Sequence, residues 1–386
     1  MANKRKPSGF YAKGFTAFGG KTPTRLQKLY PWTKSPLIVS APMLNIAGAN
    51  MAMAVTKAGG FGFIAGGLQA TNLEAHLVAA KRNLNGVATR EGTFPIGVGF
   101  INWGADIDKC IKILKRAPPA AVWFFAPEPD DRIEILKKWA TRIRTEVSPN
   151  TTIWIQIGTV VEALEYAKAG IPDVLVAQGQ DAGGHGLTQN AGIISLVPEM
   201  DDALKQAGYD IPIIAAGGIM DARGLAAAIC LGADGCAMGT RFLGSPQAEI
   251  YPAYQREVIA ATDGGLATLK TTVYDRARGI YGWPKVYRGR GLLNRTFFDS
   301  LDGVPDAEIK KMYEQQEEMA KVAGNLEKGI QTENNFGTGY GKEGRLVTYC
   351  GTGVGLLKEV MDAREIVESV RKGATDLLLK GNKAKL

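Results

Sequence analysis

Eight short runs of apolar, β-favouring residues recur between residues 37 and 239, and they restrict the possible folds of this chain more than any other feature. Segments with helical character separate the runs, and continuous apolar strands that alternate with helices are typical of a parallel sheet buried on both faces. Eight such units favour an α/β fold in which the sheet closes into a (β/α)₈ TIM barrel. The runs are Leu37–Ala41, Phe61–Ala65, Pro95–Phe100, Ala121–Phe125, Ile153–Ile157, Val174–Gln178, Ile211–Ala215 and Gly235–Met238.

The segments between the runs carry helix start and stop signals. Thr71 and Glu74 have the spacing of a capping box. An apolar stripe that begins at Val160 ends at Gly170, which predicts a helix stop. Asp221 is expected to cap the helix that follows it.

The alternation of strands and helices stops after Thr240, and this change divides the chain. We expect a basic leader over residues 1–34, the barrel over 35–243, a lid over 244–345, and a closing helix with the C-terminal tail over 346–386. The lid is predicted to be irregular to about Arg295 and then to form an amphipathic helix that includes Leu326. The closing helix is predicted over residues 356–370, with Asp362 at its start and Gly373 as its stop.

Charge and composition exclude several classes of protein. The formal net charge is +8, but nine positive charges precede the first acidic residue, Glu74. The basic excess is therefore a local, solvated leader, and we expect no nucleic-acid partner. No apolar stretch is long enough to span a membrane, and four dispersed cysteines with two histidines predict no metal site.

The C-terminal residues predict a cellular location. Ala384-Lys385-Leu386 is a conservative variant of the Ser-Lys-Leu peroxisomal signal. No apolar segment follows the basic N-terminus, so we expect no secretion. Peroxisomal import is the expectation, with a cytoplasmic location otherwise.

Two glycine-rich turns after the last two runs predict a phosphate site. They read Ala216-Gly217-Gly218-Ile219 and Ala237-Met238-Gly239-Thr240-Arg241. Loops after the seventh and eighth strands of a barrel commonly bind phosphate, because glycine lets backbone N–H groups approach it closely. The helix that begins near Asp221 is expected to direct its positive end toward the same site. The alternative is that these glycines only make tight turns.

The turn after the sixth run contains His185, one of only two histidines in the chain. Four glycines in the nine residues from Gln178 to Gly186 leave room for a planar ligand, and Gln178 offers both a donor and an acceptor. A neutral imidazole accepts a proton from an acidic carbon, and a charged imidazole stabilises an anion. His185 is therefore the candidate catalytic residue, with a structural role as the alternative, whereas His76 is predicted to be structural.

Four motifs in order make the sequence resemble the nitronate monooxygenases, formerly called 2-nitropropane dioxygenases. The resemblance extends from about Leu37 to about Val370. The motifs are Ala41-Pro42-Met43 with Ala58-Gly59-Gly60-Phe61-Gly62, Gln178 with Ala182-Gly183-Gly184-His185, Gly217-Gly218-Ile219, and Gly239-Thr240-Arg241-Phe242.

This resemblance implies a flavin-dependent monooxygenase with FMN in the barrel. It places the turn at Pro42 and Met43 along the isoalloxazine, and it makes His185 the base toward a nitroalkane or the partner of a nitronate anion. Oxygen would be consumed, and nitrite and a carbonyl compound would be released. The cofactor-binding residues implied are Ala41, Pro42, Met43, Gly99, Gln178, Gly183, Gly217, Gly218, Ala237, Met238, Gly239 and Thr240.

The sequence also departs from the pattern of that family. Leu44-Asn45-Ile46 follow Met43 where many members have a glycine pair. Gly99 replaces an asparagine and Asp181 replaces a glutamate. The residues of the flavin site are kept, while the substrate pocket differs.

Two other functions compete with nitronate oxidation. An NAD(P)H-dependent FMN reductase, which would resemble the flavin-containing enoyl-acyl carrier protein reductases, shares the barrel and a similar Gly-Gly-His turn. A non-catalytic flavin-binding protein would use His185 only structurally. An enzyme similar to IMP dehydrogenase is disfavoured, because no cysteine lies between Cys110 and Cys230 to act as the nucleophile.

Overall fold

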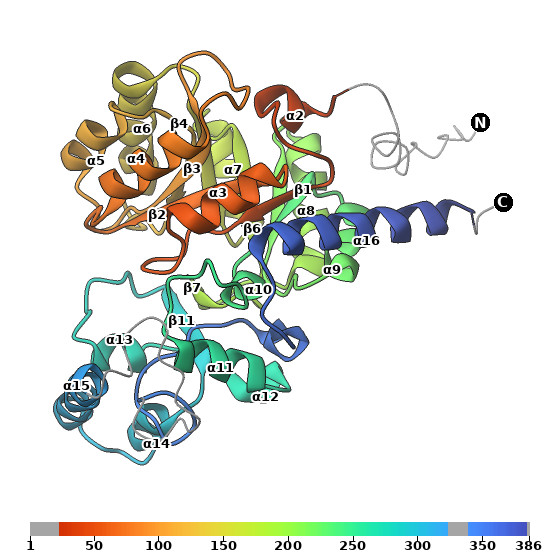
Figure 1. Ribbon diagram of the computed structural model, residues 1–386. Helices are drawn as coiled ribbons and strands as arrows, with labels where there is room; N and C mark the ends of the chain where they lie inside the picture. Colours follow the sequence, from red (N-terminus) through yellow and green to blue (C-terminus); the bar gives the residue numbers. More distant parts are fainter. Residues whose placement is uncertain (1–22, 323–338, 384–386) are drawn as a thin grey trace, which may run out of the picture.

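The computed structural model describes residues 23–322 and 339–383, and its upper layer in Figure 1 is a closed barrel. The eight barrel strands are parallel and follow the order β1-β2-β3-β4-β5-β6-β8-β9, with β9 paired to β1. The predicted TIM barrel is therefore confirmed. The strands are β1 Leu37–Ser40, β2 Phe61–Gly67, β3 Phe94–Ile101, β4 Pro119–Phe125, β5 Thr152–Ile157, β6 Val174–Gln178, β8 Ile213–Ala216 and β9 Gly235–Met238.

Helices cover the outside of the barrel, and of the two predicted start signals only the one at Asp221 is used. Thr159 and Glu162 form a capping box at α7, and the Asp221 side chain accepts hydrogen bonds from the first N–H groups of α9. The capping box predicted at Thr71 is wrong, because α4 begins after Asn72, whose backbone is left-handed and whose side chain makes no capping bond. These helices are α3 Ala49–Lys57, α4 Leu73–Asn83, α5 Ile107–Leu114, α6 Arg132–Arg142 with a π-helical turn η1 Ile143–Val147, α7 Val160–Lys168, α8 Ile193–Gln206, α9 Ala222–Cys230 and α10 Thr240–Leu243.

Aromatic side chains fill the barrel at the N-terminal ends of its strands. Phe61 and Trp154 pack there, and Tyr30, which follows α2 (Arg25–Leu29), joins them. The Tyr30 hydroxyl accepts a hydrogen bond from Trp154 Nε1 at 2.7 Å, and burial raises its pKa. Residues 23–34 therefore plug the barrel. The prediction of a solvated leader is wrong for this part. Apolar residues lie among its basic residues, and these apolar residues pack into the barrel.

The lid is the lower layer in Figure 1, and it is more regular than we predicted. Its elements are four to nine residues long before α15, too short for periodicity to reveal. The amphipathic helix α15 is confirmed by the burial of Ile309 and Tyr313, while Leu326 lies outside the described residues. The lid elements are α11 Pro252–Ala260, α12 Gly264–Ala267, β10 Thr268–Thr271, α13 Val273–Ala277, β11 Tyr287–Leu292, α14 Arg295–Leu301 and α15 Asp306–Val322.

One strand from the predicted barrel segment belongs to the lid. After β6 the chain turns at Gly184, whose φ is 65°, and β7 (Gly184–Leu187) pairs antiparallel with β11. The sheet order is β10-β11-β7, and His185 faces Gly289 across this pairing. The lid therefore holds the candidate catalytic histidine.

The closing helix α16 (Ala363–Lys383) returns to the barrel and packs against α9 and α3. Asp362 is at its start, as predicted, and its side chain accepts a hydrogen bond from Arg364 N at 2.8 Å. Gly373 does not stop the helix: a Cβ at this position would lie 2.7 Å from Ala222 Cβ, so the glycine permits the close crossing with α9. Buried Arg371 donates to three backbone carbonyls, including that of Ala58.

Two expectations about location are affected differently by the structure. Ala384-Lys385-Leu386 lies outside the described residues, so peroxisomal import stays a prediction. None of the helices in the described ranges combines the length and the apolar character that crossing a membrane requires.

Candidate active site

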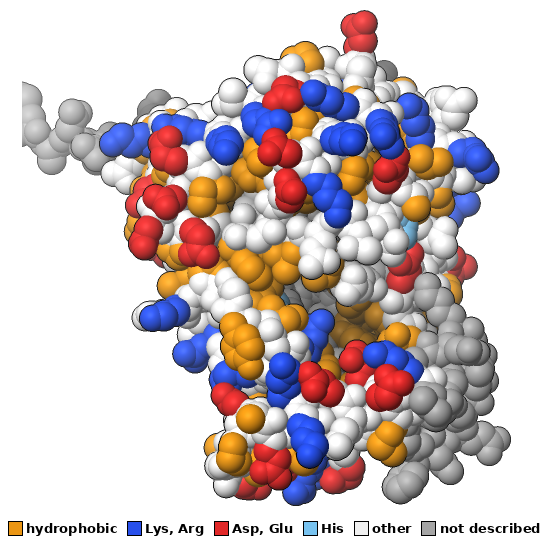
Figure 2. All heavy atoms as spheres, turned by 90° about the vertical axis from the view of Figure 1, so that its left-hand side faces the viewer, with side chains coloured by type: hydrophobic (Ala, Val, Ile, Leu, Met, Phe, Trp, Pro, Cys, Tyr) orange, Lys and Arg blue, Asp and Glu red, His pale blue; other side chains and the backbone are white. Residues whose placement is uncertain are grey.

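A cavity of about 520 Å³ lies between the C-terminal ends of the barrel strands and the lid. Figure 2 shows it as a hollow between the two layers with hydrophobic side chains on its walls. The volume is within the range of sites that bind cofactors and small molecules. Catalysis in TIM barrels also takes place at this end of the strands.

The cavity brings together almost all of the residues that the sequence analysis selected. Gly99 and Met238 are the exceptions, because neither is among the described residues that line the cavity. A Cβ on Gly99 would lie 2.4 Å from Pro42 Cβ, so Gly99 supports the turn after β1, while Met238 packs among the outer helices. The lining residues that were predicted are Ala41, Pro42, Met43, Gln178, Gly183, His185, Gly217, Gly218, Ala237, Gly239 and Thr240.

The two glycine turns form one end of the cavity. Gly217 and Gly218 have φ values of 104° and 75°, a conformation that favours glycine. Among the described residues, the N–H groups of Gly218, Gly239 and Thr240 find no protein acceptor. These donors suit a phosphate. The expected contribution of α9 is not seen, because the Asp221 carboxylate already accepts from its first N–H groups.

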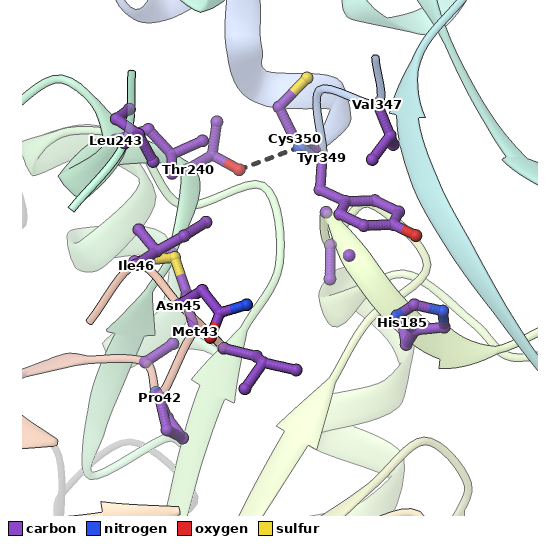
Figure 3. Close-up of a pocket in the computed structure, with 18 of the residues that line it drawn as sticks. Pro42, Met43, Asn45, Ile46, His185, Thr240, Leu243, Val347, Tyr349 and Cys350 are labelled. Carbon is purple, nitrogen blue, oxygen red and sulfur yellow. Dashed lines mark hydrogen bonds between the residues drawn. The ribbon is translucent and has the colours of Figure 1, made fainter. Parts of the chain in front are cut away.

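A third glycine-bearing segment, residues 349–353, closes this end of the cavity, and the sequence analysis missed it. Gly351 N donates to Thr240 Oγ1 at 2.9 Å, the contact marked in Figure 3. Thr352 Oγ1 donates to Asp181 Oδ1 at 3.0 Å. A Cβ on Gly183 would meet the Cys350 backbone at 2.4 Å. The glycine pair at 351 and 353 was the available signal, but it lay far from the strands in sequence.

The middle of the cavity is a gap between two walls. Figure 3 shows Pro42, Met43 and Ile46 on one side, with His185 and Tyr349 on the other. Aromatic side chains from β4 line the cavity beside this gap, where Trp123 Nε1 donates to Gln156 Oε1 at 2.9 Å. This arrangement suits a flat, apolar ring system with a polar rim.

His185 is held by groups from the lid. Its Nε2 lies 2.9 and 3.0 Å from the two carboxylate oxygens of Asp275 on α13. The indole of Trp283 stacks on the imidazole, and the Tyr349 hydroxyl donates to Asp275 Oδ1 at 3.2 Å. The His185 carbonyl accepts from Gln178 Nε2 at 3.0 Å, so the amide of Gln178 positions the histidine strand.

His76 has a structural place, in line with its prediction. Its Nδ1 accepts a hydrogen bond from Ala49 N at 3.2 Å, at the start of α3. Its Nε2 lies 3.8 Å from Glu249 Oε2. Within the described residues, no group of His, Cys, Asp and Glu side chains is arranged to hold a metal ion.

The fold and this cavity define a class: a (β/α)₈-barrel enzyme whose site combines a glycine-lined end with a histidine–aspartate pair. Comparison with known proteins then gives the family. The nitronate monooxygenase family profile matches residues 113–372, and this chain belongs to that family of oxidoreductases.

Relatives along nearly the whole chain support this assignment. A nitronate monooxygenase of Metarhizium robertsii is 43% identical, over 92% of this chain and 95% of its own length. A nitronate monooxygenase of Neurospora crassa is 36% identical, over 92% of this chain and 94% of its own. The family resemblance stated from the motifs is therefore confirmed.

Solved structures with lower identity support the fold. FabK from Thermotoga maritima has a TM-score of 0.68 at 24% identity, covering 94% of this chain and 99% of its own. Nitroalkane oxidase from Streptomyces ansochromogenes has a TM-score of 0.67 at 23% identity, covering 93% and 99%. At these identities the similarity extends to the architecture of the barrel and lid.

Proposed function

We propose that this chain is an FMN-dependent monooxygenase that oxidises alkyl nitronates with O₂ to carbonyl compounds and nitrite. The observation that carries the proposal is one cavity, in a member of the nitronate monooxygenase family, that joins the glycine turns to His185. Neutral nitroalkanes are the second candidate substrates, because His185 is placed to act as a base.

The residues present fit FMN. The free N–H groups of Gly218, Gly239 and Thr240 suit the phosphate, and a Cβ at Gly218 would crowd Asp181 Cβ at 3.1 Å on a backbone with a φ of 75°. Pro42 and Met43 offer an apolar wall for the ring system. When bound, the flavin supplies the electron-transfer chemistry that protein side chains lack.

The protein's own groups bind and orient the substrate. His185 accepts the α-proton of a neutral nitroalkane, and the charged ring then pairs with the nitronate that forms. Trp283 and Tyr254 line the lid side of the cavity and exclude water from the reacting groups. Apolar walls favour an alkyl substituent on the substrate, since its burial removes apolar surface from water.

An assay in air tests the proposal against its alternatives. Purified protein with FMN is supplied either with a nitronate such as ethyl nitronate or with NADPH, and nitrite, O₂ and NADPH are measured. We expect nitrite release and O₂ consumption with the nitronate alone. NADPH oxidation without nitrite production would instead support the FMN reductase, and no reaction with either compound would support the non-catalytic protein.

A further inference from the structure

We propose that Asp275 is a positioning residue that fixes His185 with a proton on Nε2, so that Nδ1 is the atom that takes the substrate proton. The role of Nδ1 rests on the proposed function. The position of the proton on the His185 ring does not depend on the proposed function, because it follows from contacts between protein groups.

The hydrogen bond to Asp275 assigns the tautomer. Both carboxylate oxygens lie within 3.0 Å of His185 Nε2, and an ionised carboxylate only accepts hydrogen bonds. Nε2 therefore carries the proton in the neutral ring, and Nδ1 keeps a lone pair. No described residue hydrogen-bonds Nδ1, and His185 lines the cavity, so Nδ1 is the ring nitrogen left for a substrate.

The buried carboxylate of Asp275 has a hydrogen-bond partner besides His185. The side chain is only 5% exposed, and a buried carboxylate needs partners to stay ionised. The Tyr349 hydroxyl donates to it, and burial raises the pKa of Tyr349 well above its ordinary value, so this donor keeps its proton. Arg278 hydrogen-bonds Tyr349 and is close enough to Asp275 to attract it.

The lid also fixes the plane of the imidazole. Trp283 stacks on one face of the ring, and β11 backs its Nε2 edge, where a Cβ on Gly289 would lie 3.3 Å from Nε2. When Nδ1 takes a proton, the ring becomes positive. The carboxylate of Asp275 and the indole face of Trp283 both stabilise that charge. Asp275 thus acts through His185 and does not itself accept the substrate proton.

Nitrogen NMR reads the tautomer directly, because the chain has only two histidines. In the His76→Gln variant, labelled with ¹⁵N-histidine, only the His185 ring gives signals. At a pH where this ring is neutral, we expect a protonated, pyrrole-type Nε2 and an unprotonated, pyridine-type Nδ1. The Asp275→Asn variant should lose this preference, since an amide can also donate to Nε2. A proton on Nδ1 in the protein that retains Asp275 would overturn the proposal.

Kinetics test the role of the pair with a matched control. Asp275→Asn should lower turnover of a neutral nitroalkane by about 10²–10⁴-fold, the usual contribution of a positioned base. Turnover of the pre-formed nitronate should change much less. Asp299→Asn is the control, because Asp299 is an equally buried lid aspartate that pairs with Arg345 and does not line the cavity.

The outcomes separate this proposal from the proposed function. Equal loss on both substrates, or unchanged turnover of the nitroalkane in Asp275→Asn, would overturn the positioning role. An unaltered enzyme that oxidises nitronates but not neutral nitroalkanes would overturn the role of Nδ1 as base. If it oxidises neither, the proposed function fails, while the NMR measurement still decides whether Asp275 sets the tautomer.

Discussion

The indole of Trp283 lies flat on the imidazole of His185, with ring centroids 3.7 Å apart and planes inclined by 6°. Trp283 is in the lid, and His185 is on the strand that leaves the barrel to join the lid sheet. The barrel therefore supplies the glycine turns, while the lid supplies the histidine and its orientation. A change in the lid should alter chemistry without weakening the phosphate end.

Replacing Trp283 tests whether the lid orients His185 independently of the glycine turns of the barrel. Trp283→Ala removes the stacking face, so the imidazole gains freedom and kcat on a neutral nitroalkane should fall about fivefold, since ring stacking contributes about 1 kcal/mol. Trp283→Phe should retain most of the activity. Tyr281→Ala changes an exposed aromatic residue of the same loop and serves as the control. Equal kcat values for the Ala and Phe variants would contradict the role of stacking.

The two histidines should differ in what their removal changes. His185→Ala should keep its bound FMN, seen in the visible spectrum, but lose turnover of a neutral nitroalkane. His76→Ala removes the acceptor for Ala49 N and the contact with Glu249, so it should keep turnover and lose about 1 kcal/mol in the free energy of unfolding. Activity retained by His185→Ala would leave this residue without a chemical role.

A side chain added to the glycine turns should weaken the binding of FMN. Gly218→Ala adds a methyl group beside Asp181 and strains the backbone at φ 75°, so the Kd for FMN should rise. Gly208→Ala is the control: its φ is 82°, but the added Cβ would meet nothing within 4 Å. Both variants should lose about 1 kcal/mol of stability, but only the first should bind FMN more weakly in a fluorescence titration. Equal Kd values would remove Gly218 from the phosphate site.

The lowered pKa of Lys270 predicts that the free energy of unfolding depends on pH. Its Nζ donates to Gln180 Oε1 at 2.7 Å and to Leu187 O at 2.8 Å, and burial lowers its pKa to about 8. An unfolded lysine keeps its proton to about pH 10.4, so the unfolded state binds more protons between these two values. The free energy of unfolding, relative to Lys270→Met, should therefore rise with pH in this window. A difference that stays flat or falls there would contradict the lowered pKa.

The parts of the fold that depend on local pattern could be predicted from the sequence. Each barrel strand is a continuous apolar run, because both of its faces are buried, and the glycine turns follow strand ends directly. The plug at Tyr30 was missed, because its contact with Trp154 joins residues far apart in the chain. Gly373 fits the pattern of a helix stop, whereas in the fold it permits the crossing with Ala222, which sequence pattern does not encode.

The candidate site was predicted only where it lies on the barrel. His185 was selected correctly as a lining residue, but its partner Asp275 was not, since it is 90 residues away in a short lid helix. Thr240 was assigned to phosphate, and its hydroxyl also accepts from Gly351, a contact that only the folded chain reveals. Pairing of β7 with β11 brings the histidine to Asp275, and no local sequence pattern indicates that pairing.

Mixing the FMN-bound protein with a nitronate in the absence of oxygen, with NADPH in a parallel sample, tests the central claim most directly. The absorbance of the oxidised flavin is followed after each addition. Nitronate oxidation at this site predicts rapid loss of that absorbance with the nitronate and none with NADPH. A flavin that the nitronate leaves unchanged, or that NADPH reduces rapidly, would contradict it.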